Sequence, residues 1–166
     1  MIDLKRILLV EDDPRDMELT LTALEEKKLA NEVLVVHDGE EALNYLFHRG
    51  SFRMRAPGNP VVILLDLKLP KIDGLEVLRQ IKRDDRLKMI PVVMLTSSRE
   101  ERDVVESYQL GVNAYVVKPI DFHDFVHAVK EIGLFWAVIN EPPPVAFRAA
   151  AIPEGVPPGQ IAHQDE

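Results

Sequence analysis

The chain contains no cysteine in its 166 residues. This absence excludes disulfides, thiolate metal sites and a cysteine nucleophile, and it fits a reducing compartment. Long apolar runs are also missing. No stretch approaches the roughly 20 residues that a membrane-spanning helix needs, and the first residues lack the apolar segment of a signal peptide. We therefore expect a cytoplasmic protein that has no membrane partner.

Positive charge is scarce as well. The 20 lysines and arginines are outnumbered by 28 aspartates and glutamates, which gives a formal net charge of −8. Affinity for nucleic acid depends on clustered basic residues, so we expect no nucleic-acid partner. With 46% hydrophobic and 29% charged residues, the composition is that of an ordinary globular domain with one core.

Five short apolar runs alternate with longer helical patterns. The runs are "RILLV", "EVLVV", "VVILL", "PVVMLT" and "NAYVV", and the helices are expected near residues 14–28, 40–47, 75–82, 99–109 and from 121 onward. Continuous apolar runs are typical of strands that are buried on both faces of a parallel sheet. The alternation predicts an α/β fold with a doubly wound, five-stranded parallel sheet of the flavodoxin-like (βα)5 type.

Two segments depart from this alternation. Residues 48–60, "HRGSFRMRAPGNP", form a long connection with three arginines, which indicates a mobile surface loop or a recognition loop. Residues 141–166 are too rich in proline for a packed element. We therefore expect a domain over residues 1–140, with an extended last helix, and a proline-rich tail over residues 141–166.

Carboxylates follow two of the predicted strands. Glu11 and Asp12 come directly after the first run, and Asp66 ends the third. Ligands bind at the carboxyl ends of the strands in open α/β sheets, so these acids should converge there. Converging carboxylates repel one another unless a cation lies among them. A set of oxygen ligands alone favours a hard ion such as Mg²⁺.

A hydroxyl and an ammonium group follow the last two strands. Thr96 lies at the end of "VVMLT", and Lys118 follows "NAYVV". Together with the acids they supply an attacking carboxylate, a metal site, and donors for phosphoryl oxygens. Phosphoryl transfer to an aspartate requires this combination.

These strand ends resemble the receiver domains of two-component response regulators, over about residues 3 to 135. The resemblance implies that Asp66 accepts a phosphoryl group from a histidine kinase. It also implies a metal site, and its ligands would be Glu11, Asp12, Asp66 and the backbone carbonyl of Lys68. Such a protein is not an enzyme beyond catalysing its own phosphorylation and dephosphorylation.

The same resemblance implies how the domain responds. Thr96 and Lys118 would contact the phosphoryl group. Tyr115 matches the aromatic residue whose inward rotation accompanies movement of the threonine hydroxyl. The Lys118–Pro119 peptide bond is expected to be cis, as in the family.

The last helix continues into an apolar extension, "GLFWAVIN". The apolar residues of this extension lie on nearly every side of the helix, and they are Leu134, Phe135, Trp136, Val138 and Ile139. An exposed apolar patch of this size commonly marks an interface. We expect a symmetric homodimer through this extension, or else cover by the tail. The arginine-bearing loop, the extension and the lack of an effector domain after residue 140 resemble the stand-alone receivers that serve bacterial phytochromes and related histidine kinases.

Two other classes of protein share features with this sequence. A phosphohydrolase of the haloacid-dehalogenase type also has an aspartate nucleophile and Mg²⁺, but it normally needs a second aspartate where Lys68 stands. A flavodoxin-like flavin binder needs a loop that accepts phosphate after the first strand, and "EDDP" would repel a phosphate.

The segment "SREERD" predicts a solvated helix start that Ser97 or Ser98 caps.

Overall fold

The computed structural model describes residues 6–26 and 32–144. Their centre is a five-stranded parallel sheet in the order β2-β1-β3-β4-β5. The strands are β1 (Arg6–Val10), β2 (Glu32–Val36), β3 (Val62–Leu65), β4 (Val92–Thr96) and β5 (Ala114–Val117). The predicted flavodoxin-like sheet is confirmed. The strand order reverses between β1 and β3, which is where ligands bind in open α/β sheets.

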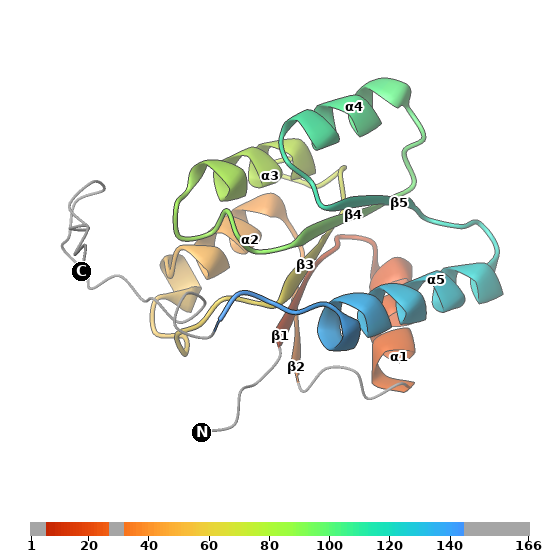
Figure 1. Ribbon diagram of the computed structural model, residues 1–166, viewed down its shortest axis with the longest axis horizontal. Coiled ribbons are helices and arrows are strands. Elements are labelled where there is room, and N and C mark those ends of the chain that lie inside the picture. The colour runs from red at the N-terminus through yellow and green to blue at the C-terminus, as the bar shows by residue number, and fades with distance from the viewer. Residues whose placement is uncertain (1–5, 27–31, 145–166) are drawn as a thin grey trace.

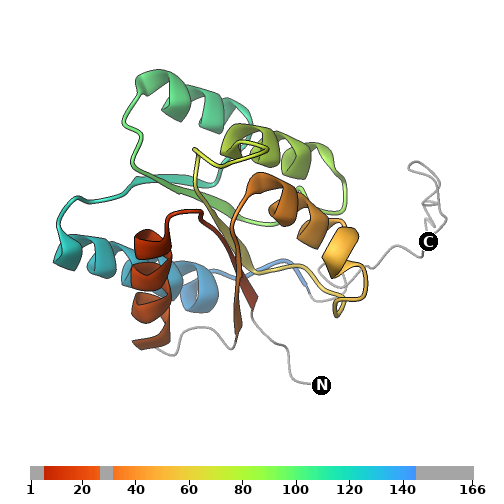
Figure 2. The same ribbon diagram turned by 180° about the vertical axis from the view of Figure 1, so that it is seen from behind.

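Helices cover both faces of the sheet (Figures 1 and 2). They are α1 (Pro14–Glu26), α2 (Gly39–Leu46), α3 (Gly74–Arg83), α4 (Glu101–Gln109) and α5 (Phe122–Leu134). Helices α1 and α5 pack on one face, and α2, α3 and α4 pack on the other. Each helix starts within two residues of its predicted start. Within the described part of the chain, no helix has the length and apolar character that crossing a bilayer demands.

Alternate residues of each strand enter two separate cores. In β1, Ile7 and Leu9 join the core beneath α1 and α5, whereas Leu8 and Val10 join the core beneath α2 and α3. All four side chains are buried. Because both faces of the central strands are covered, their sequences read as continuous apolar runs. The first polar residue after each run therefore marks the end of the apolar core.

Aspartates begin three of the helices. The side chains of Asp38, Asp73 and Asp121 each accept a hydrogen bond from the backbone N–H three residues on, which caps α2, α3 and α5. Helix α4 differs, because its first flanking residue is Glu100 and no side chain caps it there. The prediction that Ser97 or Ser98 caps this helix is wrong.

The Lys118–Pro119 peptide bond is trans, since no peptide bond among the described residues is cis. The expectation of a cis bond is therefore wrong. Trans is the lower-energy isomer of an X–Pro bond. The backbone N–H of Lys118 still donates to the carbonyl of Thr96, at 2.7 Å, so β4 and β5 stay paired up to this residue.

The extension of the last helix forms a π-helical turn over Phe135–Ile139. Trp136 packs against the core beneath α1 and α5, and Ala137 is buried. Leu134, Phe135, Val138 and Ile139 are exposed, so the extension is apolar on its outer side as well. Residues 145–166, most of the predicted tail, lie outside the described residues.

The segment over residues 48–60 includes a short 3₁₀ helix, Gly50–Phe52. The Arg55 guanidinium lies 4.0 Å from the centre of the Tyr45 ring and donates to the carbonyls of Tyr45 and Gly58. One of the three arginines therefore holds the segment together. Arg49 and Arg53 are exposed.

Candidate functional site

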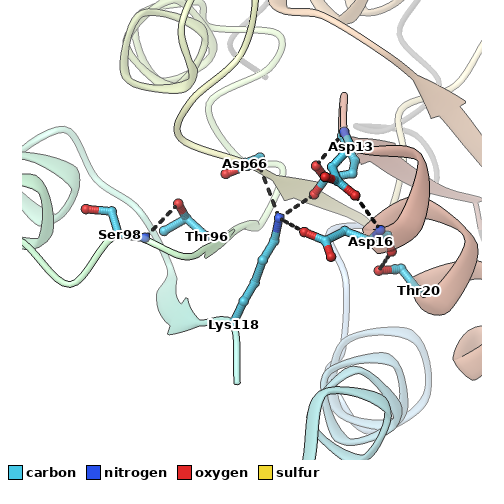
Figure 3. Close-up of polar contacts among 8 residues, drawn as sticks. Asp13, Asp16, Thr20, Asp66, Thr96, Ser98 and Lys118 are labelled. Atoms are coloured by element: carbon cyan, nitrogen blue, oxygen red, sulfur yellow. Dashed lines mark hydrogen bonds and ion pairs between the residues drawn. The ribbon is translucent and has the colours of Figure 1, made fainter. Parts of the chain in front are cut away.

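Polar side chains from four strand ends meet at one edge of the sheet (Figure 3). Glu11 and Asp12 follow β1, Asp66 follows β3, Thr96 ends β4, and Lys118 follows β5. This edge includes the reversal of strand order between β1 and β3. The sequence predicted that these residues lie together, and the structure brings them together.

The ammonium group of Lys118 is the centre of the site (Figure 3). Its Nζ donates to Glu11 Oε2 at 2.7 Å, to Asp16 Oδ2 at 2.9 Å and to Asp66 Oδ2 at 3.1 Å. Lys118, Glu11 and Asp66 are buried. Hydrogen bonds between a buried ammonium and carboxylates are strong, because little water screens the charges. One cation thus faces three acidic side chains.

The excess of negative charge fits a divalent cation. Glu11, Asp12 and Asp66 each offer a carboxylate oxygen, and these oxygens lie within 4.8 Å of one another. Asp12 is exposed, which leaves the cluster open to solvent on one side. Hard ions such as Mg²⁺ and Mn²⁺ take this kind of oxygen set. Lys68, whose backbone carbonyl the resemblance to receiver domains implies as a further ligand, lies two residues after Asp66 and has an exposed side chain.

Burial, opposed by the hydrogen bond from Lys118 and assisted by the nearby charge of Asp66, raises the pKa of Glu11 to about 7. For Lys118, burial would lower the pKa, but the hydrogen bonds that it donates to Glu11 and Asp16 and the charge of Asp66 outweigh burial and leave the pKa raised. The lysine is therefore charged at neutral pH. Glu11 is divided between its protonated and charged forms.

Metal affinity should rise with pH as Glu11 loses its proton. A metal ligand must be deprotonated, so below the pKa of about 7 the apparent affinity for Mg²⁺ or Mn²⁺ should rise by up to about tenfold per pH unit. Above that pKa the affinity should level off. Calorimetric titrations across this range measure the effect, and Glu11→Gln should flatten it. A wild-type affinity that does not change with pH would contradict the assignment of Glu11.

Sequence reasoning missed Asp16. This residue lies in the first turn of α1, and its backbone N–H donates to Asp13 Oδ1 at 2.9 Å. The helix turns the Asp16 carboxylate back toward the strand ends, where it meets Lys118. The available signal was an acid in the first helical turn, just after a strand that is followed by acids. However, acids are common in the first turn of any helix because they stabilise it, so this position alone does not indicate a site.

A hydrogen-bonded chain connects Thr96 to α4 and β5. The backbone N–H of Ser98 donates to Thr96 Oγ1 at 3.3 Å, and Ser98 Oγ donates to Asp103 Oδ2 at 2.6 Å. Tyr115 Oη donates to the carbonyl of Ser98 at 3.1 Å. Asp103 is 8% exposed, so the prediction that the acids of "SREERD" are solvated is wrong for this residue.

A groove lies beside the Lys118 side chain. It encloses about 270 Å³ between α1 and the β5–α5 connection, and its lining residues are Asp13, Arg15, Asp16, Leu19, Ser97, Lys118, Pro119, Ile120, Phe122 and Phe125. Ile120 is 96% exposed, and Phe122 is also exposed. The charged site is thus bordered by an apolar surface that solvent reaches.

A comparison with protein families decides what this arrangement is. The response regulator receiver domain matches residues 7–130. The chain belongs to the response regulator receiver family. Receiver domains accept a phosphoryl group from a histidine kinase on an aspartate, and they are typically signalling proteins without enzymatic activity. The family that matches is neither that of the haloacid-dehalogenase-type phosphohydrolases nor that of a flavin binder.

Similar proteins include regulators associated with phytochromes. The bacteriophytochrome response regulator RtBRR is 67% identical, with 86% of each chain covered and a TM-score of 0.69. The phosphorylated cyanobacterial phytochrome response regulator RcpA is 42% identical and has a TM-score of 0.81, with 86% of this chain and all of that chain covered. Response regulator Rcp1 of Synechocystis is 43% identical over 80% of this chain and 88% of its own length. Rcp1 also has a solved Mn²⁺-bound form.

Proposed function

We propose that this receiver accepts a phosphoryl group on Asp66. The observation that carries the proposal is the buried Lys118 ammonium, which contacts both Asp66 and Glu11 at the edge of the sheet. Glu11, Asp12, Asp66 and the backbone carbonyl of Lys68 would hold Mg²⁺, and the side chains of Thr96 and Lys118 would contact the phosphoryl oxygens.

The chemistry is transfer of a phosphoryl group from nitrogen to oxygen. A carboxylate oxygen of Asp66 attacks phosphorus, the bond from phosphorus to the imidazole nitrogen of a phosphohistidine breaks, and the imidazole leaves with the electron pair. Lys118 offsets charge on the phosphoryl oxygens, and Thr96 offers a hydroxyl donor. A bound Mg²⁺ would supply further positive charge. Because the receiver provides all these groups, it catalyses its own phosphorylation.

A phytochrome-type histidine kinase is the proposed donor. The support is the 67% identity to a bacteriophytochrome response regulator, together with the likeness to the phytochrome regulator RcpA. The groove between α1 and the β5–α5 connection gives the donor a docking surface beside Lys118. The exposed side chains of Ile120 and Phe122 border it and can be buried by a partner.

Acetyl phosphate tests the chemistry without a kinase. Incubation with acetyl phosphate and Mg²⁺ should add one phosphoryl group to the intact protein by mass spectrometry, and hydroxylamine should remove it, because an aspartyl phosphate is an acyl phosphate. Omission of the metal should suppress the gain. No mass gain with both reagents present would overturn the proposed function.

We propose that phosphorylation causes a conformational change that is transmitted from Thr96 to Tyr115. Movement of the Thr96 hydroxyl toward a phosphoryl group would break its bond from the Ser98 N–H. Ser98 also contacts Asp103 of α4 and Tyr115 of β5. One displaced hydroxyl would therefore change the contacts of both elements and alter the surface that α4, β5 and α5 present.

The extension of α5 is proposed as a homodimer surface, because Leu134, Phe135, Val138 and Ile139 are exposed together at one end of the helix. Trp136 packs against its own core and would sit at the edge of that surface. Sedimentation at micromolar concentration should show a dimer for the wild type and a monomer for the Phe135→Glu, Ile139→Glu double variant. A wild type that is monomeric with and without phosphorylation would exclude the dimer.

A further inference from the structure

Two histidines lie one helical turn apart on the outer side of α5. His123 and His127 are both exposed, whereas Phe125, Val129 and Ile132 form the buried stripe of the same helix. Residues four apart on a helix are neighbours on one face, with about 5–6 Å between their Cβ atoms. The two imidazole rings therefore share one stretch of surface that solvent reaches, and the core does not use them.

Both rings have room to turn toward a common ion. The ring of His123 makes an edge contact with the ring of Phe122, with 5.4 Å between the ring centres, and the side chain of His127 is 76% exposed. Neither ring is enclosed, so a change of rotamer costs little. Two histidines at this spacing on a helix can bind the same ion, as in the H-E-x-x-H helices of zinc enzymes.

A carboxylate stands beside the second histidine. Glu131 Oε1 lies 3.9 Å from His127 Nε2, and both side chains are exposed. This separation is too long for a hydrogen bond, but a shift of about 1 Å would form one. Metal-bound histidines usually donate their second ring N–H to a carboxylate, which fixes the orientation of the ring and strengthens the ligand. Glu131 can give His127 this support while the other ring nitrogen binds an ion.

The charges around the pair do not repel a cation. Lys130 is the one basic residue in the turn that follows His127, and its Nζ lies 2.6 Å from Glu26 Oε2 of α1. That positive charge is therefore neutralised by an ion pair with another helix. Asp124 and Glu131 are exposed acids of α5, so the negative charge near the histidines is not fully compensated.

We propose that His123 and His127 form a second metal site, which binds a transition-metal ion such as Zn²⁺, Cu²⁺ or Ni²⁺. The two imidazoles are the protein ligands, water completes the coordination, and Glu131 is a positioning residue that holds the His127 ring. Imidazole suits these ions, whereas the oxygen ligands around Asp66 suit Mg²⁺. The site does not depend on the proposed function, so either can fail without the other.

Calorimetric titration with Zn²⁺ tests the site, at saturating Mg²⁺ so that the carboxylates around Asp66 are occupied, and at mildly alkaline pH because bound imidazole must be neutral. The wild type should bind one Zn²⁺ ion. His123→Gln and His127→Gln should each weaken binding about tenfold or more, since loss of even an outer partner of a ligand costs about 10- to 100-fold. Equal affinity in the wild type and His127→Gln would overturn the proposal, and so would a wild type that binds no Zn²⁺.

The role of Glu131 has its own variants. Glu131→Ala removes the acceptor for the His127 ring and should weaken Zn²⁺ binding about tenfold, the lower end of the range for outer partners of metal ligands. Glu131→Gln keeps an acceptor oxygen and should restore part of the affinity. Unchanged affinity in Glu131→Ala would overturn the positioning role of Glu131.

Two further variants test whether the spacing matters. His37→Gln removes an exposed histidine outside α5 and should leave the affinity for Zn²⁺ unchanged, whereas a loss would place the ion elsewhere. The double variant His123→Gln, Glu131→His rebuilds a pair of histidines four residues apart, one turn further along the helix. It should bind Zn²⁺ more tightly than His123→Gln alone, and a failure of this rescue would contradict binding by a helical pair.

Discussion

Asp66→Asn should abolish the mass gain with acetyl phosphate and Mg²⁺. An amide oxygen is a far weaker nucleophile than a carboxylate. Glu11, Asp16 and Asp66 all contact Lys118, but Asp66 is the one that follows β3, the strand that pairs with β4 and so lies beside Thr96. Asp85→Asn is the matched control, because the same chemical change falls on a side chain that is 87% exposed. This variant should be labelled like the wild type. Equal labelling of Asp66→Asn and the wild type would place the nucleophile elsewhere.

The loss of labelling should not come from unfolding. In the metal-free protein, Asp66 repels Glu11, which is one cause of the raised pKa of Glu11. Asp66→Asn removes that repulsion, while Lys118 keeps its bonds to Glu11 and Asp16. Urea denaturation without metal should therefore show the variant to be at least as stable as the wild type. A clearly less stable variant would mean that Asp66 is structural and would require another probe of its role.

The sequence predicted the fold well because the two-sided burial of the strands leaves a clear pattern. Runs such as "VVILL" can only be strands covered on both faces or buried helix, and their short length and alternation with helical patterns favour strands. The site followed from the same logic. Once the strands are parallel, the residue after each run must lie at the carboxyl edge, so the positions of Asp66, Thr96 and Lys118 follow from chain order.

The features that were missed depend on distances that no local pattern contains. Asp16 reaches Lys118 only because of how α1 is rotated above the end of β1, and Asp103 is buried only because the β4–α4 connection brings Ser98 against it. Both acids stand in the first turn of a helix, where acids are common on electrostatic grounds alone. The π-helical turn over Phe135–Ile139 likewise shares its apolar composition with an ordinary helix end.

The second large effect is expected at Gly74, the first residue of α3. Its backbone N–H donates to the carbonyl of Leu67 at 2.7 Å, which holds the start of the helix against the end of β3. A Cβ at this position would lie 2.1 Å from the carbonyl oxygen of Asp66 and 2.8 Å from the Cα of Leu67. Real Cβ atoms do not approach backbone atoms so closely, so either α3 or the segment that carries Asp66 must move.

Gly74→Ala should lower the free energy of unfolding by about 2–3 kcal/mol. Two effects oppose each other. Alanine favours a helix over glycine by about 1 kcal/mol, whereas overpacking of a well-packed region costs about 1–3 kcal/mol and more when rigid backbone must shift. The clash should win because all three nearest atoms belong to the backbone and no rotamer change can move them. Urea denaturation measures the loss, and Gln109→Ala, at the exposed end of α4, is the control.

Gly74→Ala should also weaken the site in molecules that remain folded. The atom that the new Cβ meets first belongs to Asp66, so relief of the clash displaces the residue that supplies both the proposed nucleophile and a proposed metal ligand. A carboxylate moved by a few tenths of an ångström loses alignment with Lys118 and with the other metal ligands. Metal affinity and the rate of labelling by acetyl phosphate should both fall. A variant as stable and as reactive as the wild type would show that α3 can shift without moving Asp66.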